Sequence, residues 1–179
     1  AWQRDLLDIV DKSESALVVA PTSSGKTFIS FYTMKQILLE NKSAKNLNET
    51  GTVVFVLPTN ALVLQVSAEV YCRYGPVYGV ITRAYKHNAD NCRVLITTPN
   101  YFEEMLLSPT KQPWVKRIKY VIFDEVHCVA DSQKGGHIWT RIISMINCPF
   151  LALSATVGNP EEFCEYLNTL QSKVHLVKF

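Results

Sequence analysis

The fold predicted for this chain follows from the eight residues Ala20-Pro21-Thr22-Ser23-Ser24-Gly25-Lys26-Thr27. The apolar run Leu17–Val19 precedes it, and Phe28–Glu40, with apolar residues at helical spacing, follows it. A strand, a tight loop of small residues and a helix are typical of a phosphate-binding loop, in which backbone N–H groups converge on phosphate oxygens. In such a loop the Lys26 ammonium reaches the β- and γ-phosphates, and the Thr27 hydroxyl binds Mg²⁺. Ala20 stands where the usual pattern has glycine, which keeps the position small but makes positive φ less accessible.

Fully apolar runs alternate with segments of helical spacing along the whole chain. The predicted strands cover residues 17–20, 53–57, 77–81, 93–97, 120–123, 150–153 and 174–177, and the predicted helices cover residues 2–10, 27–40, 61–72, 100–107, 138–146 and a segment from Pro160 capped by Asn159. Pro109–Pro113 is expected to be a loop. Strands that are apolar throughout are buried on both faces. The sequence therefore predicts a single α/β domain over residues 1–179, with a mostly parallel sheet and helices on both faces.

Polar residues follow the predicted strands directly. They occur at Ala20–Thr27, Pro58–Asn60, Thr97–Pro99, Asp124–His127 and Ser154–Thr156. In a parallel sheet these positions share the carboxyl edge, where ligands bind in open α/β folds. The polar segment Asn41–Gly51 precedes a strand instead, so it is expected at the opposite edge.

The amino-acid composition indicates the cellular compartment of the protein and the kinds of partner that it can bind. The apolar fraction of 47% is ordinary for a soluble domain, and no stretch is long and apolar enough to cross a membrane. Five scattered cysteines favour reduced thiols inside a cell, so a cytoplasmic protein without a membrane partner is expected. The net charge of +2 is nearly neutral, so a polyanionic partner has to be inferred from local sites.

Asp124-Glu125 follows the apolar run Tyr120–Phe123. An isolated Asp-Glu pair is most often an ordinary acidic strand end. Beside a phosphate-binding loop, however, the aspartate can hold Mg²⁺ through its water shell and the glutamate can deprotonate the attacking water. We therefore expect Asp124 to be the metal residue and Glu125 the catalytic base.

In these features the chain resembles the DExH-box helicases of superfamily two, and among them the superkiller-like group. The matching elements are Ala20–Thr27 (motif I), Pro58–Leu62 (motif Ia), Thr97–Pro99 (motif Ib), Asp124–His127 (motif II) and Ser154–Thr156 (motif III). The phrases Tyr120–Cys128 and Cys148–Pro160 carry a narrower resemblance, to an interferon-induced antiviral branch of these helicases. The resemblance covers nearly the whole chain and implies the first of two RecA-like P-loop NTPase lobes.

The resemblance also implies ATP and Mg²⁺ as cofactors, and RNA and a second RecA-like lobe of the same protein as partners. The residues that it assigns to the nucleotide are Gln3, Thr22, Ser23, Ser24, Gly25, Lys26 and Thr27. Gln3 would read adenine; the alternative is a solvated polar residue. His127, Ser154 and Thr156 resemble residues that couple the nucleotide state to movement between lobes.

Motifs Ia and Ib resemble a nucleic-acid track that holds phosphates and sugars without reading bases. The residues expected to contact nucleic acid are Pro58, Thr59, Asn60, Arg83, Thr97 and Thr98. Asn60 stands where the family usually has lysine, so one charged contact to the nucleic-acid backbone would be lost and the affinity for nucleic acid is in doubt. Arg83 could restore a cation nearby, or it could be a solvated loop residue.

Two functions remain open at this point. The first is a motor lobe that hydrolyses ATP together with a second lobe and RNA. The second is an NTP-regulated scaffold or sensor that binds nucleic acid without unwinding it. A DNA helicase lobe is a variant of the first, since the residues do not distinguish RNA from DNA.

Overall fold

The computed structural model describes residues 2–21, 24–46, 49–126 and 136–179. Within these ranges eight strands form one sheet in the order β4-β3-β5-β2-β6-β7-β1-β8. Neighbouring strands run parallel, except for the antiparallel pair β3–β4 at one edge. The strands are β1 (Ser15–Val19), β2 (Thr52–Val56), β3 (Tyr78–Ile81), β4 (Lys86–His87), β5 (Val94–Thr97), β6 (Ile118–Phe123), β7 (Phe150–Ser154) and β8 (Val174–Lys178).

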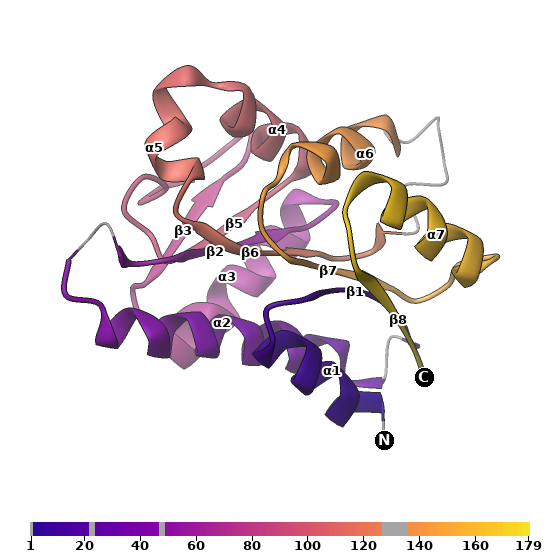
Figure 1. Ribbon diagram of the computed structural model, residues 1–179. Coiled ribbons are helices and arrows are strands. Elements are labelled where there is room, and N and C mark those ends of the chain that lie inside the picture. The colour runs from indigo at the N-terminus through magenta and orange to yellow at the C-terminus, as the bar shows by residue number, and fades with distance from the viewer. Residues whose placement is uncertain (1, 22–23, 47–48, 127–135) are drawn as a thin grey trace.

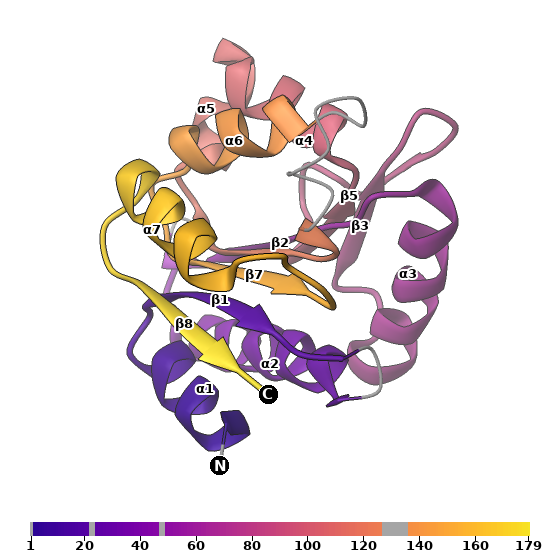
Figure 2. The same cartoon turned by 90° about the vertical axis from the view of Figure 1, so that its right-hand side faces the viewer.

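Helices cover both faces of the sheet, as Figures 1 and 2 show. One face carries α1 (Trp2–Asp11), α2 (Lys26–Ser43) and α3 (Asn60–Tyr74). The other carries α4 (Pro99–Leu107), α5 (Gln112–Val115), α6 (Gly136–Met145) and α7 (Pro160–Leu170). The short 3₁₀ helix η3 (Pro109–Lys111) connects α4 to α5.

The central strands divide their side chains between two apolar cores. In β2, Val53 and Phe55 join the core beneath α1–α3, whereas Val54 and Val56 join the core beneath α4–α7. All four side chains are at most 2% exposed. This two-sided burial is the reason that the strands are apolar throughout, and it confirms the predicted α/β fold.

Three local predictions differ from the structure. Residues 109–113, expected to be a loop, form η3 and the start of α5. Pro109 is the first residue of η3 and Pro113 the second residue of α5, and in the first turn of a helix the missing N–H has no intrahelical acceptor to lose. The helix after the phosphate-binding loop continues to Ser43 instead of ending at Glu40, and the two-residue β4 was not predicted.

The topology places the carboxyl ends of β1, β2, β3, β5, β6 and β7 at the same edge. The segments that follow these strands therefore meet there, as the sequence predicted. Among the described residues no helix is long and apolar enough to span a membrane.

Candidate nucleotide and nucleic-acid site

The start of α2 has the geometry that binding of phosphate requires. Gly25 precedes the helix with φ of 89°, a left-handed conformation that glycine adopts without steric cost. The backbone N–H and the hydroxyl of Ser24 both donate to the Pro21 carbonyl oxygen, at 3.0 and 2.5 Å, and close the loop. The Phe28 N–H, the third of α2, donates to the Gly25 carbonyl oxygen at 3.0 Å. The N–H groups at the start of a helix of this kind can bind an anion.

Lys26 supplies the charge at this position. Its side chain is only 5% exposed, and its Nζ atom has no hydrogen-bond partner among the described residues. A buried ammonium without a partner is costly, so a site of this kind is suited to an anionic ligand. Lys26 therefore fits the β- and γ-phosphates of a nucleotide.

Gln3 lies beside the same loop. Its Nε2 atom donates to the Ser24 carbonyl oxygen at 3.4 Å. This contact brings a residue from the start of α1 to the phosphate-binding loop, the position from which it can meet a nucleotide base. Thr22, Ser23 and His127 lie outside the described residues.

Asp124 and Glu125 continue β6 beyond its last residue. The Asp124 N–H donates to the Val56 carbonyl oxygen at 3.0 Å, and the Glu125 N–H donates to Asp124 Oδ1, also at 3.0 Å. Glu125 has φ of 57°, which is uncommon for a residue with a side chain and is found more often at functional sites. In the sheet order only β7 separates β6 from β1, so the acidic pair lies near the phosphate-binding loop.

A magnesium ion needs few ligands from this chain. No cluster of three or more metal-ligating side chains occurs within the described ranges. Mg²⁺ in nucleotide sites is typically held by one or two side chains together with phosphate oxygens and waters. The Thr27 hydroxyl, which is exposed, and the Asp124 carboxylate fit that ligand set.

Ser154 links two of the strand ends. The Ala20 N–H donates to the Ser154 carbonyl oxygen at 3.0 Å, and the Ser154 hydroxyl donates to the Thr156 carbonyl oxygen at 3.1 Å. The Ser154 side chain is fully buried. Motif III is thus joined directly to the beginning of the phosphate-binding loop.

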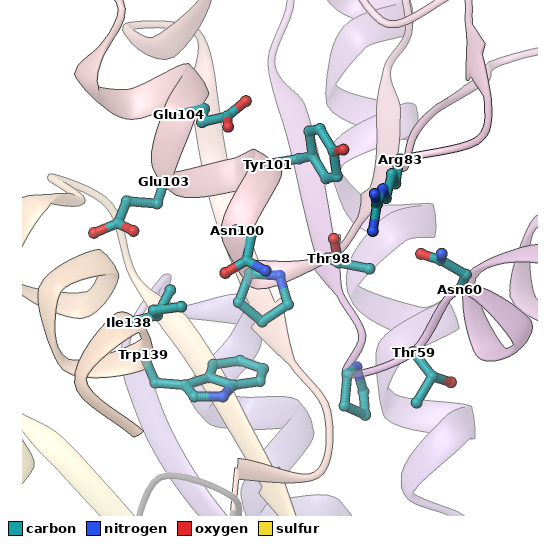
Figure 3. A pocket seen from close by; sticks show the side chains of 12 residues that line it. Thr59, Asn60, Arg83, Thr98, Asn100, Tyr101, Glu103, Glu104, Ile138 and Trp139 are labelled. Carbon is teal, nitrogen blue, oxygen red and sulfur yellow. The ribbon is translucent and has the colours of Figure 1, made fainter. Parts of the chain in front are cut away.

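A second depression at this edge, here named the strand-end hollow, has a volume of about 1000 Å³ (Figure 3). Its lining consists of Pro58, Thr59, Asn60, Arg83, Thr98, Pro99, Asn100, Tyr101, Glu103, Glu104, Ile138 and Trp139. Five of the six residues expected to contact nucleic acid therefore gather around one space. Arg83 is held there by a turn in which the Thr82 N–H donates to the Tyr85 carbonyl oxygen at 2.8 Å.

Thr97 is the exception among the six. Its side chain is fully buried, and its hydroxyl donates to the Ile81 carbonyl oxygen at 2.8 Å, joining β5 to β3. It is the last residue of β5, where the side chain turns into the protein. The neighbouring Thr98 lines the strand-end hollow, with 8% of its surface exposed, so any contact from Thr97 would be indirect.

Other residues that line the strand-end hollow were not among those expected from the sequence to contact nucleic acid. Asn100 and Tyr101 lie in the first turn of α4, directly after motif Ib, and this position in the sequence could have identified them. Ile138 and Trp139 lie in α6, and they face the same space as α4 and α3 in Figure 3. Glu103 of α4 forms two hydrogen bonds with Arg141 of α6, so the two helices are fixed to each other at the wall of the hollow. This contact holds the pKa of Glu103 below its usual range.

A family model described as DEAD/DEAH box helicase matches residues 1–163. The chain belongs to this family. It is 47% identical over 96% of its length to the human protein named probable ATP-dependent RNA helicase DDX60-like, and 42% identical over 99% of its length to an uncharacterized helicase of Caenorhabditis elegans. It is also 32% identical over 89% of its length to the ATP-dependent DNA helicase Hel308 of Methanococcus vannielii.

The chain spans about a tenth of the DDX60-like and Caenorhabditis proteins, 10% and 11% respectively. Among solved structures, the DUF1998 helicase MrfA bound to DNA has a TM-score of 0.76 over the whole of this chain and a quarter of its own. The Hef helicase domain of Pyrococcus furiosus has a TM-score of 0.73 over 99% of this chain and 38% of its own. Both are 22% identical to this chain and establish the RecA-like fold alone.

Proposed function

We propose that this chain is the ATP-binding lobe of an ATP-dependent RNA helicase of the DExH type. The observation that carries the proposal is the buried Lys26 Nζ atom, which has no partner among the described residues and lies at the start of an 18-residue helix. Asp124, Glu125 and the strand-end hollow share the same sheet edge. A nucleotide and a nucleic-acid strand can therefore bind side by side on one lobe.

Each residue has a distinct part in the proposed hydrolysis of ATP. Lys26 and the first N–H groups of α2 bind the phosphates, and Gln3 meets the base. Thr27 and Asp124 hold Mg²⁺, which when bound neutralises charge on the phosphates. Glu125 orients the attacking water and accepts its proton.

The nucleic acid is proposed to cross the strand-end hollow. Thr59, Asn60 and Thr98 would contact sugars and phosphates, and Arg83 would provide a cation. We favour RNA because the DDX60-like protein and the exosome helicase MTR4, 31% identical to this chain, are both named RNA helicases. The name of Hel308 keeps a DNA substrate as the alternative.

Coupling between the two sites is proposed to pass through motif III. The Ser154–Ala20 and Ser154–Thr156 hydrogen bonds join the end of β7 to the phosphate-binding loop. A change in that loop on hydrolysis would therefore reach Thr156, and through it a second RecA-like lobe of the same protein. His127 is proposed to act in the same coupling.

The experiment is RNA-stimulated ATP hydrolysis by the full-length protein, in which we propose that a second RecA-like lobe accompanies this one. Glu125→Gln is expected to lower kcat at least about 100-fold, the usual contribution of a general base, while nucleotide affinity is retained. Glu165→Gln, an exposed change of the same kind in α7, is the control and should hydrolyse ATP normally. If Glu125→Gln hydrolysed ATP at the unaltered rate, Glu125 would not be the catalytic base. If the unaltered protein bound RNA but did not hydrolyse ATP, the alternative function as an NTP-regulated scaffold would be favoured.

A further inference from the structure

A second hollow lies at the edge of the sheet opposite the nucleotide site. It has a volume of about 630 Å³, and we name it the basic hollow. It is lined by Lys35, Leu38, Leu39, Asn41, Lys42, Thr50, Arg73, Tyr74, Val77 and Arg93. Thr50, Val77 and Arg93 precede β2, β3 and β5, and the other residues lie in the C-terminal halves of α2 and α3. In Figure 1 this is the left-hand side, where α2 ends and β2 begins.

All charged residues that line the basic hollow are cationic. Four of its residues are cationic, namely Lys35, Lys42, Arg73 and Arg93, and none is acidic. The chain as a whole has 18 basic and 16 acidic residues, so the imbalance is local. The strand-end hollow is different, because Arg83 there is accompanied by Glu103 and Glu104.

Among the residues that the structure describes, these four cations have no acidic partner. Glu49, next to Thr50 in the chain, accepts a hydrogen bond from the Lys45 N–H at 2.9 Å and lies outside the lining. Arg73 is held by packing, with its guanidinium carbon 4.2 Å from the centroid of the Phe31 ring.

Part of the lining of the basic hollow is apolar. This part consists of Leu38, Leu39, Tyr74 and Val77, of which Leu39 is 43% exposed. The Tyr74 hydroxyl donates to the Phe31 carbonyl oxygen at 2.7 Å, which fixes the ring in the wall. An exposed leucine surrounded by cations is a feature of binding surfaces in which an apolar anchor is flanked by polar contacts.

We propose that the basic hollow docks an acidic protein segment in which an aliphatic or aromatic anchor is flanked by carboxylates. The anchor would lie on Leu38, Leu39 and Val77, and the carboxylates would pair with Lys35, Lys42 and Arg93. Charge complementarity of this kind selects the partner and accelerates association.

A nucleic-acid strand fits the same surface less well. Single-stranded binding needs a groove that follows the phosphates and exposed aromatic faces on which bases stack. The apolar part of this lining is mainly aliphatic, and the hydroxyl of its aromatic residue, Tyr74, is already bonded to the backbone. The docking proposal is independent of the proposed enzymatic function, because the two sites lie at opposite edges of the sheet.

The test is fluorescence anisotropy with labelled ten-residue peptides, in which two leucines or two phenylalanines stand between four glutamates on each side. Matched probes replace the two apolar residues with serine, and a labelled uridine decanucleotide tests the other class of ligand. The protein variants are the double change Lys35→Glu with Arg93→Glu, the change Leu39→Ser, and the control Lys12→Glu. Lys12 is exposed at the same edge but does not line the basic hollow.

The expected result is saturable binding of at least one apolar acidic peptide. This binding should be at least about tenfold weaker for the double charge reversal and for Leu39→Ser, and unchanged for Lys12→Glu. All variants should bind an ATP analogue normally, which shows that they are folded and separates this proposal from the nucleotide site. The proposal would be overturned if no peptide bound, or if the serine peptides bound as tightly as the apolar ones. It would also be overturned if charge reversal weakened binding of the oligonucleotide and left peptide binding unchanged.

Discussion

Gln3 and Gly25 approach each other across the entrance to α2. A Cβ atom built at Gly25 would lie 3.2 Å from Gln3 Nε2, and Gly25 has φ of 89°. The phosphate-binding loop is therefore constrained both by its own backbone and by the residue proposed to meet the nucleotide base.

Gly25→Ala is expected to lower both stability and nucleotide affinity. The left-handed backbone costs alanine about 1–2 kcal/mol, which corresponds to roughly 2–8 °C in Tm for a domain of this size. Displacement of Gln3 should add a loss of affinity for ATP analogues. Thermal denaturation and isothermal titration calorimetry measure the two effects.

Gly75→Ala is the matched control for this change. Gly75 also has positive φ, at 75°, but a Cβ there would meet no atom within 4 Å. It should lose a comparable or larger amount of stability and bind nucleotide normally. If both variants lost nucleotide affinity equally, the loss would come from lowered overall stability and not from a change in the phosphate-binding loop.

Thr98→Ala is expected to weaken binding to every single-stranded sequence by a similar factor. Loss of one backbone hydrogen bond, about 1 kcal/mol, corresponds to roughly fivefold in affinity. Thr98 precedes α4 without a side-chain cap, so its removal should leave the helix intact. Binding of unrelated homopolymers measures this, and a change in sequence preference at constant affinity would contradict backbone contact.

Thr59 needs a different substitution. Its side-chain oxygen accepts a hydrogen bond from the Leu62 N–H at 3.3 Å and caps α3, so alanine would also cost about 1 kcal/mol of helix stability. Thr59→Ser keeps the cap and the hydroxyl. Relative to alanine, serine should restore both nucleic-acid affinity and Tm. An alanine variant with a lower Tm but unchanged nucleic-acid affinity would show that Thr59 acts only as a cap.

Much of the fold and part of the site were predictable from sequence because they depend on local patterns. Apolar strands such as residues 53–57 indicated burial on both faces, and a polar segment after each strand indicated the edge where ligands bind. Asn159 was predicted to cap α7, and its side chain does accept a hydrogen bond from the Glu162 N–H. These features are decided by neighbours in the chain.

Other features depend on contacts between distant segments. Thr97 ends β5 and Thr98 follows it, so the sequence offers two threonines at the same strand end. The Thr97 hydroxyl donates to the Ile81 carbonyl oxygen, whereas Thr98 lines the strand-end hollow. The contribution of Trp139 to that hollow depends on how α6 packs against α4. Prolines at 109 and 113 indicated a loop by composition, although each is permitted in the first turn of a helix.

The contact between Glu103 and Arg141 should make stability depend on pH. The pKa of Glu103 is lowered in the folded state by the hydrogen bond with Arg141. The contact therefore adds to the free energy of unfolding above the pKa of Glu103 in the unfolded chain, and this stabilisation is lost as pH falls through the lower pKa of the folded state. Glu103→Gln should reduce Tm slightly at pH 7, as expected for a partly exposed pair. The difference in Tm from the unaltered protein should disappear under acidic conditions, and a difference that grew on acidification would contradict this account.

Binding of nucleotide phosphates by Lys26 can be measured by calorimetric titration with a non-hydrolysable ATP analogue and Mg²⁺. Lys26→Ala should lower affinity at least about tenfold, because a charge-assisted contact to phosphate is lost from a buried site. Lys35→Ala, which removes the same charge from an exposed position in α2, should bind the analogue normally. Equal affinity of the unaltered protein and Lys26→Ala would contradict the account.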